Sequence, residues 1–234
     1  MGGSGRATDR QEAASALRWW LETGVDVATQ EVPRNWLDSA KAPAPKPAAA
    51  PAPTPPVTDS LDSFRQWLSA GPDAPLASAR SKPVLPQGVE GAEVMILAEP
   101  PTREEIACAS PIGGEAAELM ERMLKAIAMD GKAYIANLAC FHSPGGRLSA
   151  EQLDHCARAA RRHVALARPK RLLLLGEAPV RALLGKPLIQ ARGHIHKVEG
   201  VRTVATFHPR QLLKRPSDKA LAWKDLLLLT EESQ

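Results

Sequence analysis

The sequence predicts an α/β fold, a three-layer α/β/α sandwich with a central, mainly parallel four-stranded sheet. Two observations favour this fold: short apolar runs typical of buried strands, and helical patterns lying between those runs. The composition, 44% hydrophobic and 24% charged, is that of an ordinary globular protein. Because strand and helix alternate, crossover connections and parallel strands are expected.

Apolar residues without polar alternation predict strands that are buried on both faces. Three segments have this character: 93–98 (EVMILA), 133–138 (AYIANL) and 171–175 (RLLLL). Residues 194–198 and 201–207 also have the pattern of strands, and Glu199-Gly200 between them is typical of a tight turn.

Apolar residues at helical spacing predict four helices: 60–68, 115–128, 179–184 and 217–229. In the last of these, Trp223 is expected to anchor the helix in the core. A fifth helix is expected to begin at Ser149, whose hydroxyl and the Gln152 side chain form a capping box, and to end near Ala167.

The chain is expected to have three parts. Residues 1–40 form a short tryptophan-rich segment, and residues 41–57 form a flexible linker dominated by Pro and Ala (KAPAPKPAAAPAPTPP). Only residues 58–234 are numerous enough to bury a sizeable core.

Charge is distributed unevenly over the third part. Residues 140–219 contain 16 Lys and Arg, 5 Asp and Glu, and all six histidines. A strongly basic half is typical of a protein that binds a polyanion such as nucleic acid, although a solvated basic surface is the simpler reading.

Cysteine content and hydropathy exclude other classes of protein. Three cysteines in 234 residues do not make a disulfide scaffold. The sequence has neither a long uncharged apolar run nor a secretory signal. We therefore expect a cytoplasmic monomer, associated with the nucleoid if the source is bacterial.

Three polar residues follow predicted strands: Glu99, Asn137 and His208. Ligands of parallel sheets bind at the carboxyl ends of the strands, so these side chains are expected at one crevice. Each also has a structural reading, since Asn137 could cap a turn and His208 could be a buried structural histidine. Together they favour polar recognition and acid–base chemistry.

Five segments from Val94 to Leu226 occur in the order and spacing of the uracil-DNA glycosylase superfamily, which the chain therefore resembles. They are AEPPTREEIACASPIGGEAAELMERML, YIANLACFHSPGGR, LLLLGEAPVRALLG, RG at 192–193, and TFHPRQLLKRPSDKALAWKDL. The resemblance is nearest to the family-four, iron–sulfur branch.

This resemblance implies that a uracil flipped out of DNA is bound. Asn137 would read the base, and His208 would stabilise the charge on its O2 as it departs. Glu99 and Glu105 would orient water or offset positive charge on the sugar. Pro101 and Ile112 belong to the loop that surrounds the base.

The same resemblance places a DNA-binding surface after His208. Leu212 would fill the space that the extruded base leaves in the duplex, and Arg210, Lys214 and Arg215 would grip phosphates. Arg147 in the preceding loop is expected to contribute to this surface.

Two departures from the family concern the first loop, residues 98–102, and the later position 112. Ala98 and Thr102 stand where the family has glycine, and this restricts the loop if close approach of the backbone is required. Ile112 replaces an aromatic residue that stacks on the base, and such stacking contributes about 1–3 kcal/mol per base. Ile112 should therefore weaken uracil binding or admit another modified pyrimidine.

A third departure concerns the cofactor. The family-four cluster has four thiolate ligands, but only Cys140 and Cys156 match ligand positions, and Cys108 is out of register. We therefore expect no iron–sulfur cluster and read Cys140 and Cys156 as buried thiols. His194 and His196 share a strand face, but with no third ligand evident we expect no metal.

The N-terminal part contains an amphipathic helical pattern at residues 9–22. Trp19, Trp20 and Trp36 lie within residues 1–40. The helix could dock on the body of the same chain, or it could anchor a protein partner.

The leading hypothesis is a monofunctional, hydrolytic DNA glycosylase, since no lysine in the motifs is placed for Schiff-base chemistry. The alternative is a DNA-binding adaptor that keeps the fold and has lost turnover. An unrelated nucleotide-binding protein is disfavoured because the sequence has no glycine-rich phosphate loop.

Overall fold

The computed structural model describes residues 59–77, 82–143, 145 and 147–231, together with Ser15, Arg18, Trp19 and Glu22. Contacts divide the chain into two units, Met1–Ala50 and Pro51–Gln234. The predicted linker 41–57, Trp20 and Trp36 lie outside the described residues. Within the described residues, no helix is both long and apolar enough to cross a membrane.

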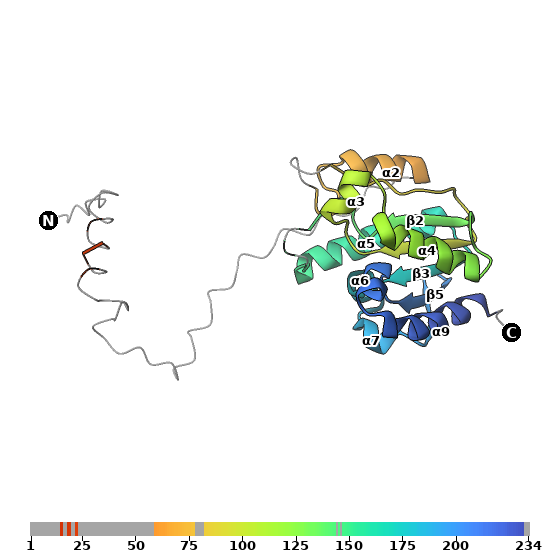
Figure 1. Ribbon diagram of the computed structural model, residues 1–234. Helices are drawn as coiled ribbons and strands as arrows, with labels where there is room; N and C mark the ends of the chain where they lie inside the picture. The colour runs from red at the N-terminus through yellow and green to blue at the C-terminus, as the bar shows by residue number, and fades with distance from the viewer. Residues whose placement is uncertain are drawn as a thin grey trace, which may run out of the picture. The chain divides into compact units, whose positions relative to one another are not determined.

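A five-stranded sheet in the order β2-β1-β3-β5-β4 forms the centre of the second unit (Figure 1). Its strands are β1 (Val94–Ala98), β2 (Ala133–Asn137), β3 (Arg171–Leu175), β4 (Ile195–Val198) and β5 (Val201–Thr206). Only β4 is antiparallel, and it pairs with β5 at one edge. The α/β/α fold is thus confirmed, with one strand more than the four expected.

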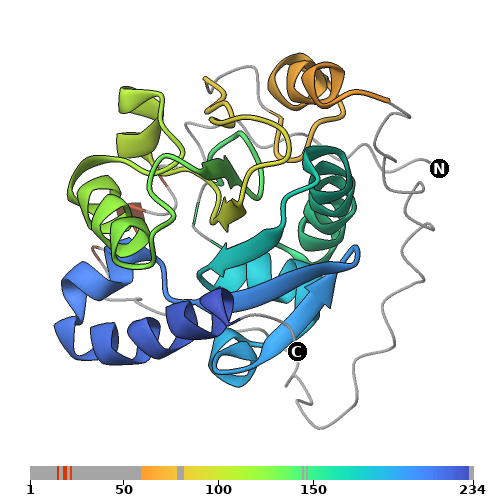
Figure 2. The same ribbon diagram turned by 90° about the vertical axis from the view of Figure 1, so that its right-hand side faces the viewer.

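Helices cover both faces of this sheet (Figure 2). One layer contains α4 (Gly114–Ala126), α8 (Pro209–Lys214) and α9 (Lys219–Thr230), and α4 packs against α8. The other contains α5 (Ala150–Ala167), which packs against α6 (Glu177–Leu184) and α2 (Leu61–Ala70). The remaining short helices are α3 (Arg103–Cys108), α7 (Leu188–Ala191) and a 3₁₀ turn (Pro216–Asp218).

The hydrophobic core lies on both sides of the central strands. Every residue of β1 is completely buried, as are Leu172–Leu175 of β3. This burial explains why these strands are continuous apolar runs in the sequence. The predicted capping box at Ser149 begins α5, where the Ser149 hydroxyl accepts a hydrogen bond from the Gln152 N–H.

The closing helix differs from the expectation. Trp223 is 42% exposed, so it is not the core anchor that was predicted. The buried residues of α9 are Ala222, Asp225, Leu226 and Leu229. Because apolar residues occur almost all around this helix, the sequence did not indicate which of them face inward.

A buried ion pair attaches α9 to the sheet. The Asp225 carboxylate accepts hydrogen bonds from Arg192 Nε at 2.8 Å and from the Thr206 hydroxyl at 2.7 Å. It also accepts one from the Gly193 N–H at 3.1 Å. Burial raises the pKa of Asp225, and these donors oppose that shift. The contacts fix the end of β5, the strand that leads to His208.

Candidate active site

The site lies at one edge of the sheet, where four parallel strands end in register. Asn137 of β2 is opposite Ala98 of β1, which is opposite Leu175 of β3, which is opposite Thr206 of β5. Neighbouring strands are about 4.8 Å apart, so Asn137 and Thr206 are separated by about 14 Å. Glu99 and His208 follow two of these strand ends. The structure thus places Glu99, Asn137 and His208 at the same edge of the sheet.

Asn137 is held in one orientation. Its Nδ2 donates to the carbonyl oxygens of Glu99 at 2.7 Å and of Pro111 at 3.0 Å. Since carbonyl oxygens only accept hydrogen bonds, these contacts fix which side of the amide is nitrogen. Oδ1 is buried and has no hydrogen-bond partner among the described residues. Asn137 therefore offers an acceptor, because its Nδ2 already donates to the carbonyl oxygens of Glu99 and Pro111.

His208 presents the opposite polarity. It is 2% exposed, and its Nδ1 accepts the main-chain N–H of Arg210 at 3.2 Å. Burial, together with the nearby charge of Arg210, lowers the pKa of His208 to about 3. The neutral ring therefore carries its proton on Nε2. That atom is buried and has no partner among the described residues, so it is an unused donor.

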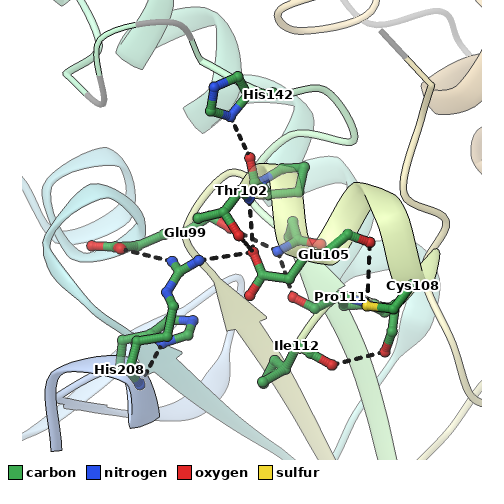
Figure 3. Close-up of polar contacts among 12 residues, drawn as sticks. Glu99, Thr102, Glu105, Cys108, Pro111, Ile112, His142 and His208 are labelled. Atoms are coloured by element: carbon green, nitrogen blue, oxygen red, sulfur yellow. Dashed lines mark hydrogen bonds and ion pairs between the residues drawn. The ribbon is translucent and has the colours of Figure 1, made fainter. Parts of the chain in front are cut away.

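The two carboxylates that follow β1, Glu99 in the first loop and Glu105 in α3, have different environments (Figure 3). Glu105 is buried, and its Oε2 accepts from the Thr102 N–H at 2.8 Å, the Thr102 hydroxyl at 3.0 Å and Arg210 Nη1 at 2.8 Å. Its Oε1 is buried and has no partner among the described residues. Glu99 uses both oxygens, one for the Glu177 N–H at 3.1 Å and one for Arg210 Nη2 at 3.2 Å. Of the two carboxylates, Glu105 is the one with an oxygen that has no hydrogen-bond partner among the described residues.

The first loop does not require the glycine that Thr102 replaces. Thr102 has φ −84° and ψ 176°, an extended conformation open to any residue. Its hydroxyl adds a hydrogen bond to Glu105 that glycine could not make. Ile112 is buried at 4% exposure, and its carbonyl oxygen accepts from the Ser110 hydroxyl at 2.9 Å.

A cavity of about 750 Å³ opens at this edge of the sheet. Its lining includes Pro101 and Thr102 of the first loop and four residues that can carry positive charge: His142, Arg147, Arg181 and Arg210. His142 was not selected from the sequence. Its Nδ1 donates to the Pro101 carbonyl at 2.7 Å, which joins the loops that follow β1 and β2. Only the tertiary structure shows this contact.

The DNA-binding residues predicted around α8 have different positions. Lys214, Arg215 and Arg147 are exposed, as a phosphate-binding role requires. Arg210 instead pairs with two carboxylates. Leu212 is 1% exposed and lies in the hydrophobic core, which corrects its assignment as the residue that enters the DNA stack. Leu213, the next residue, is only partly buried.

The described cysteines do not fit an iron–sulfur cluster. A cluster of this kind takes four thiolates, whereas the sequence has three cysteines, and burial raises the pKa of Cys140 and of Cys156 to about 12 each. The two thiols belong to different hydrophobic clusters, and Cys140 lies among the apolar side chains of Phe64, Leu68 and Phe141. Among the described residues, no group of three His, Cys, Asp or Glu side chains could hold a metal ion.

A comparison with known protein families assigns the chain to one of them. The Uracil DNA glycosylase superfamily profile matches residues 85–227, more than half of the chain. The chain belongs to the uracil-DNA glycosylase superfamily.

Two curated relatives place the chain near the family-four branch of this superfamily. A type-4 uracil-DNA glycosylase of Archaeoglobus fulgidus is 25% identical over 170 residues, which are 68% of this chain and 85% of that protein. One from Pyrobaculum aerophilum is also 25% identical, over 166 residues, 66% of this chain and 85% of that protein.

Gly176 is expected to be required for the position of Glu99. Its φ is +94°, and an added Cβ would lie 2.5 Å from Glu99 Oε1. Gly176→Ala should therefore displace Glu99 as well as strain the backbone. Gly200→Ala is the matched control, because Gly200 has φ +80° with nothing within 4 Å. We expect about 1–2 kcal/mol of destabilisation for Gly200→Ala and more for Gly176→Ala, measured by urea unfolding. Equal losses of unfolding free energy in the two variants would contradict the contact between Gly176 and Glu99.

The buried imidazoles predict that stability falls in mild acid. His208 and His163 have pKa values of about 3 when folded, and 6.5 is the ordinary value. Below pH 6.5 the unfolded chain binds protons that the folded chain does not, so stability present at neutral pH is lost as the pH falls.

Each histidine should contribute a slope of about 1.4 kcal/mol per pH unit between pH 6 and 4. Urea unfolding at several pH values measures this slope. His208→Asn should reduce it by the contribution of one proton, whereas the exposed His194→Asn should leave it unchanged. A wild-type slope in His208→Asn would show that His208 is not held neutral.

Proposed function

We propose that the protein is a monofunctional DNA glycosylase that hydrolyses the N-glycosidic bond of uracil, or of a modified pyrimidine, extruded from DNA. The observation that carries this proposal is a set of three buried polar atoms at one edge of the sheet without partners among the described residues. They are Asn137 Oδ1, His208 Nε2 and Glu105 Oε1. Buried polar atoms are normally paired, so this set favours a ligand that pairs them.

The polarity of these atoms suits uracil. Asn137 Oδ1 would accept the N3–H of the base, and His208 Nε2–H would donate to O2. Cytosine has no proton on N3, so its lone pair would face the Asn137 oxygen. An acceptor fixed in orientation therefore selects against cytosine without any contact to the exocyclic group.

The hydrolytic step follows from the same placement. The bond between C1′ and N1 breaks, and its electron pair leaves with the base. The negative charge spreads onto O2, where the neutral His208 donor stabilises it. A water molecule attacks C1′, and Glu105 Oε1 accepts its proton. Glu99 accepts from the Glu177 N–H and from Arg210 Nη2, so it holds the first loop against α6, and it also lines the cavity.

Exposed basic side chains support DNA as the polymer. Arg147, Lys214 and Arg215 are all exposed. Leu213 replaces Leu212 as the candidate for insertion into the duplex, because it is the partly buried leucine of α8. A protein partner bound through Trp19, Trp20 and Trp36 stays a prediction from the sequence.

Excision is tested with oligonucleotides that contain one deoxyuridine, single-stranded and double-stranded, followed by alkaline cleavage of abasic sites. The wild-type protein should release uracil and leave cytosine in the same context. His208→Ala should lower the single-turnover rate by about 10²–10³-fold, and Asn137→Ala should also lower it strongly.

The exposed His194→Ala is the control for excision and should retain wild-type activity. DNA binding without strand cleavage in the wild-type protein would refute excision of uracil and favour the adaptor. The observation that favours the adaptor as a second function is the pairing of Arg210 with both Glu99 and Glu105.

We further propose that folding requires no iron–sulfur cluster, since the sequence has fewer than four cysteines and Cys140 and Cys156 lie in separate apolar surroundings. Protein purified without oxygen should contain no stoichiometric iron or sulfide and no visible absorbance. Iron at cluster stoichiometry, lost together with colour in Cys140→Ala, would overturn this prediction.

A further inference from the structure

We propose that Arg210 is a positioning residue, which clamps Glu99 and Glu105 beside His208 and does not bind a DNA phosphate. The proposal rests on the proposed function and adds to it a residue that organises the catalytic groups. It also changes the role that the sequence suggested for Arg210.

Arg210 contacts all three residues predicted to be catalytic. Its Nη1 lies 2.8 Å from Glu105 Oε2, and its Nη2 lies 3.2 Å from Glu99 Oε2. Its main-chain N–H donates to His208 Nδ1 at 3.2 Å. One residue therefore joins the loop after β1 to the loop after β5. The planar guanidinium suits this arrangement because its two amino groups can each bind a separate carboxylate.

The same contacts make Arg210 a poor phosphate ligand. Its side chain is 23% exposed, and two carboxylates already surround its single charge. A phosphate would have to displace at least one of them and leave that carboxylate without its cation. Lys214 and Arg215, later in the same segment, are exposed and face no such competition from Glu99 or Glu105.

Loss of the clamp would affect Glu105 most. Its side chain is 2% exposed, and Arg210 supplies the only charged donor among its hydrogen bonds. Without the guanidinium, the carboxylate would be buried with two neutral donors, both from Thr102. The Glu105 carboxylate could then rotate, so that its other oxygen would face the base. The chemical step should slow, while the surface that binds DNA would be unchanged.

Two measurements on the full chain separate the clamp from a phosphate contact: the single-turnover rate at saturating DNA, and the dependence of DNA affinity on salt concentration. Arg210→Gln should lower the rate at least tenfold and leave the salt slope at its wild-type value. Arg215→Gln is the reference for a phosphate contact and should reduce the slope by about one.

Two further variants test whether the rate depends on the charge or on the guanidinium geometry of Arg210. Arg122→Gln removes an exposed charge on α4 and should leave the rate unchanged. Arg210→Lys keeps the charge but lacks the two-pronged geometry, so its rate should fall between those of wild type and Arg210→Gln. A reduced salt slope in Arg210→Gln, or an unchanged rate at saturation, overturns the proposal.

A double-mutant comparison tests the clamp even if the wild-type protein releases no base. Arg210→Gln, Glu105→Gln and the double variant are compared by their urea unfolding midpoints. The double variant should be at least as stable as Arg210→Gln alone, since a neutral glutamine at position 105 needs no cation. Additive losses in the midpoint would show that the two residues are not coupled. If the wild-type protein releases no base but the changes in midpoint are non-additive, the proposed function is rejected and the clamp is retained.

Discussion

In-register pairing of four parallel strands is the constraint on which the site depends. It sets Asn137, Ala98, Leu175 and Thr206 in one row, so the loops that follow these strands must share one edge. The central strands are completely buried on both faces, and a slip of register would disrupt both layers of the core. The hydrophobic packing of the central strands thus positions the polar groups at the edge, although these polar groups are not part of that packing.

Hydrogen bonds from the first loop then orient individual atoms. Asn137 uses its amide nitrogen to bind the carbonyl oxygens of Glu99 and Pro111, so the same contacts that fold the loop aim the amide oxygen. His208 is oriented by a main-chain N–H two residues later. Unpaired polar atoms in such fixed side chains are costly in the free protein. They are the expected result of a site built to bind a polar ligand.

Much of the fold could be predicted from the sequence because the strands are uninterrupted apolar runs and the capping box at Ser149 is explicit. Asn137 and His208 could be selected because each follows such a run. The orientation of individual residues could not. Leu212 and Leu213 are chemically identical neighbours, and only packing against α4 decides that Leu212 is buried.

Long-range contacts were equally hidden from sequence reasoning. Arg210 was read as a phosphate ligand because it lies among basic residues, whereas its partner Glu105 is 105 positions earlier in the chain. His142 was overlooked because its contact with Pro101 joins two loops. The short helix α8 was not foreseen, since six residues that begin with Pro209 carry too little periodicity to be recognised.

The charges within the site match the charges that the proposed glycosidic cleavage would create. Two carboxylates and one guanidinium leave one net negative charge, which would lie beside the sugar where positive charge develops. A protonated His208 would cancel that charge. Burial and the neighbouring guanidinium both disfavour its protonated form, so in the proposed reaction the imidazole would act on the departing base as a neutral donor. Arg210 therefore has two effects that reinforce each other: it orients the carboxylates, and it helps to keep His208 uncharged.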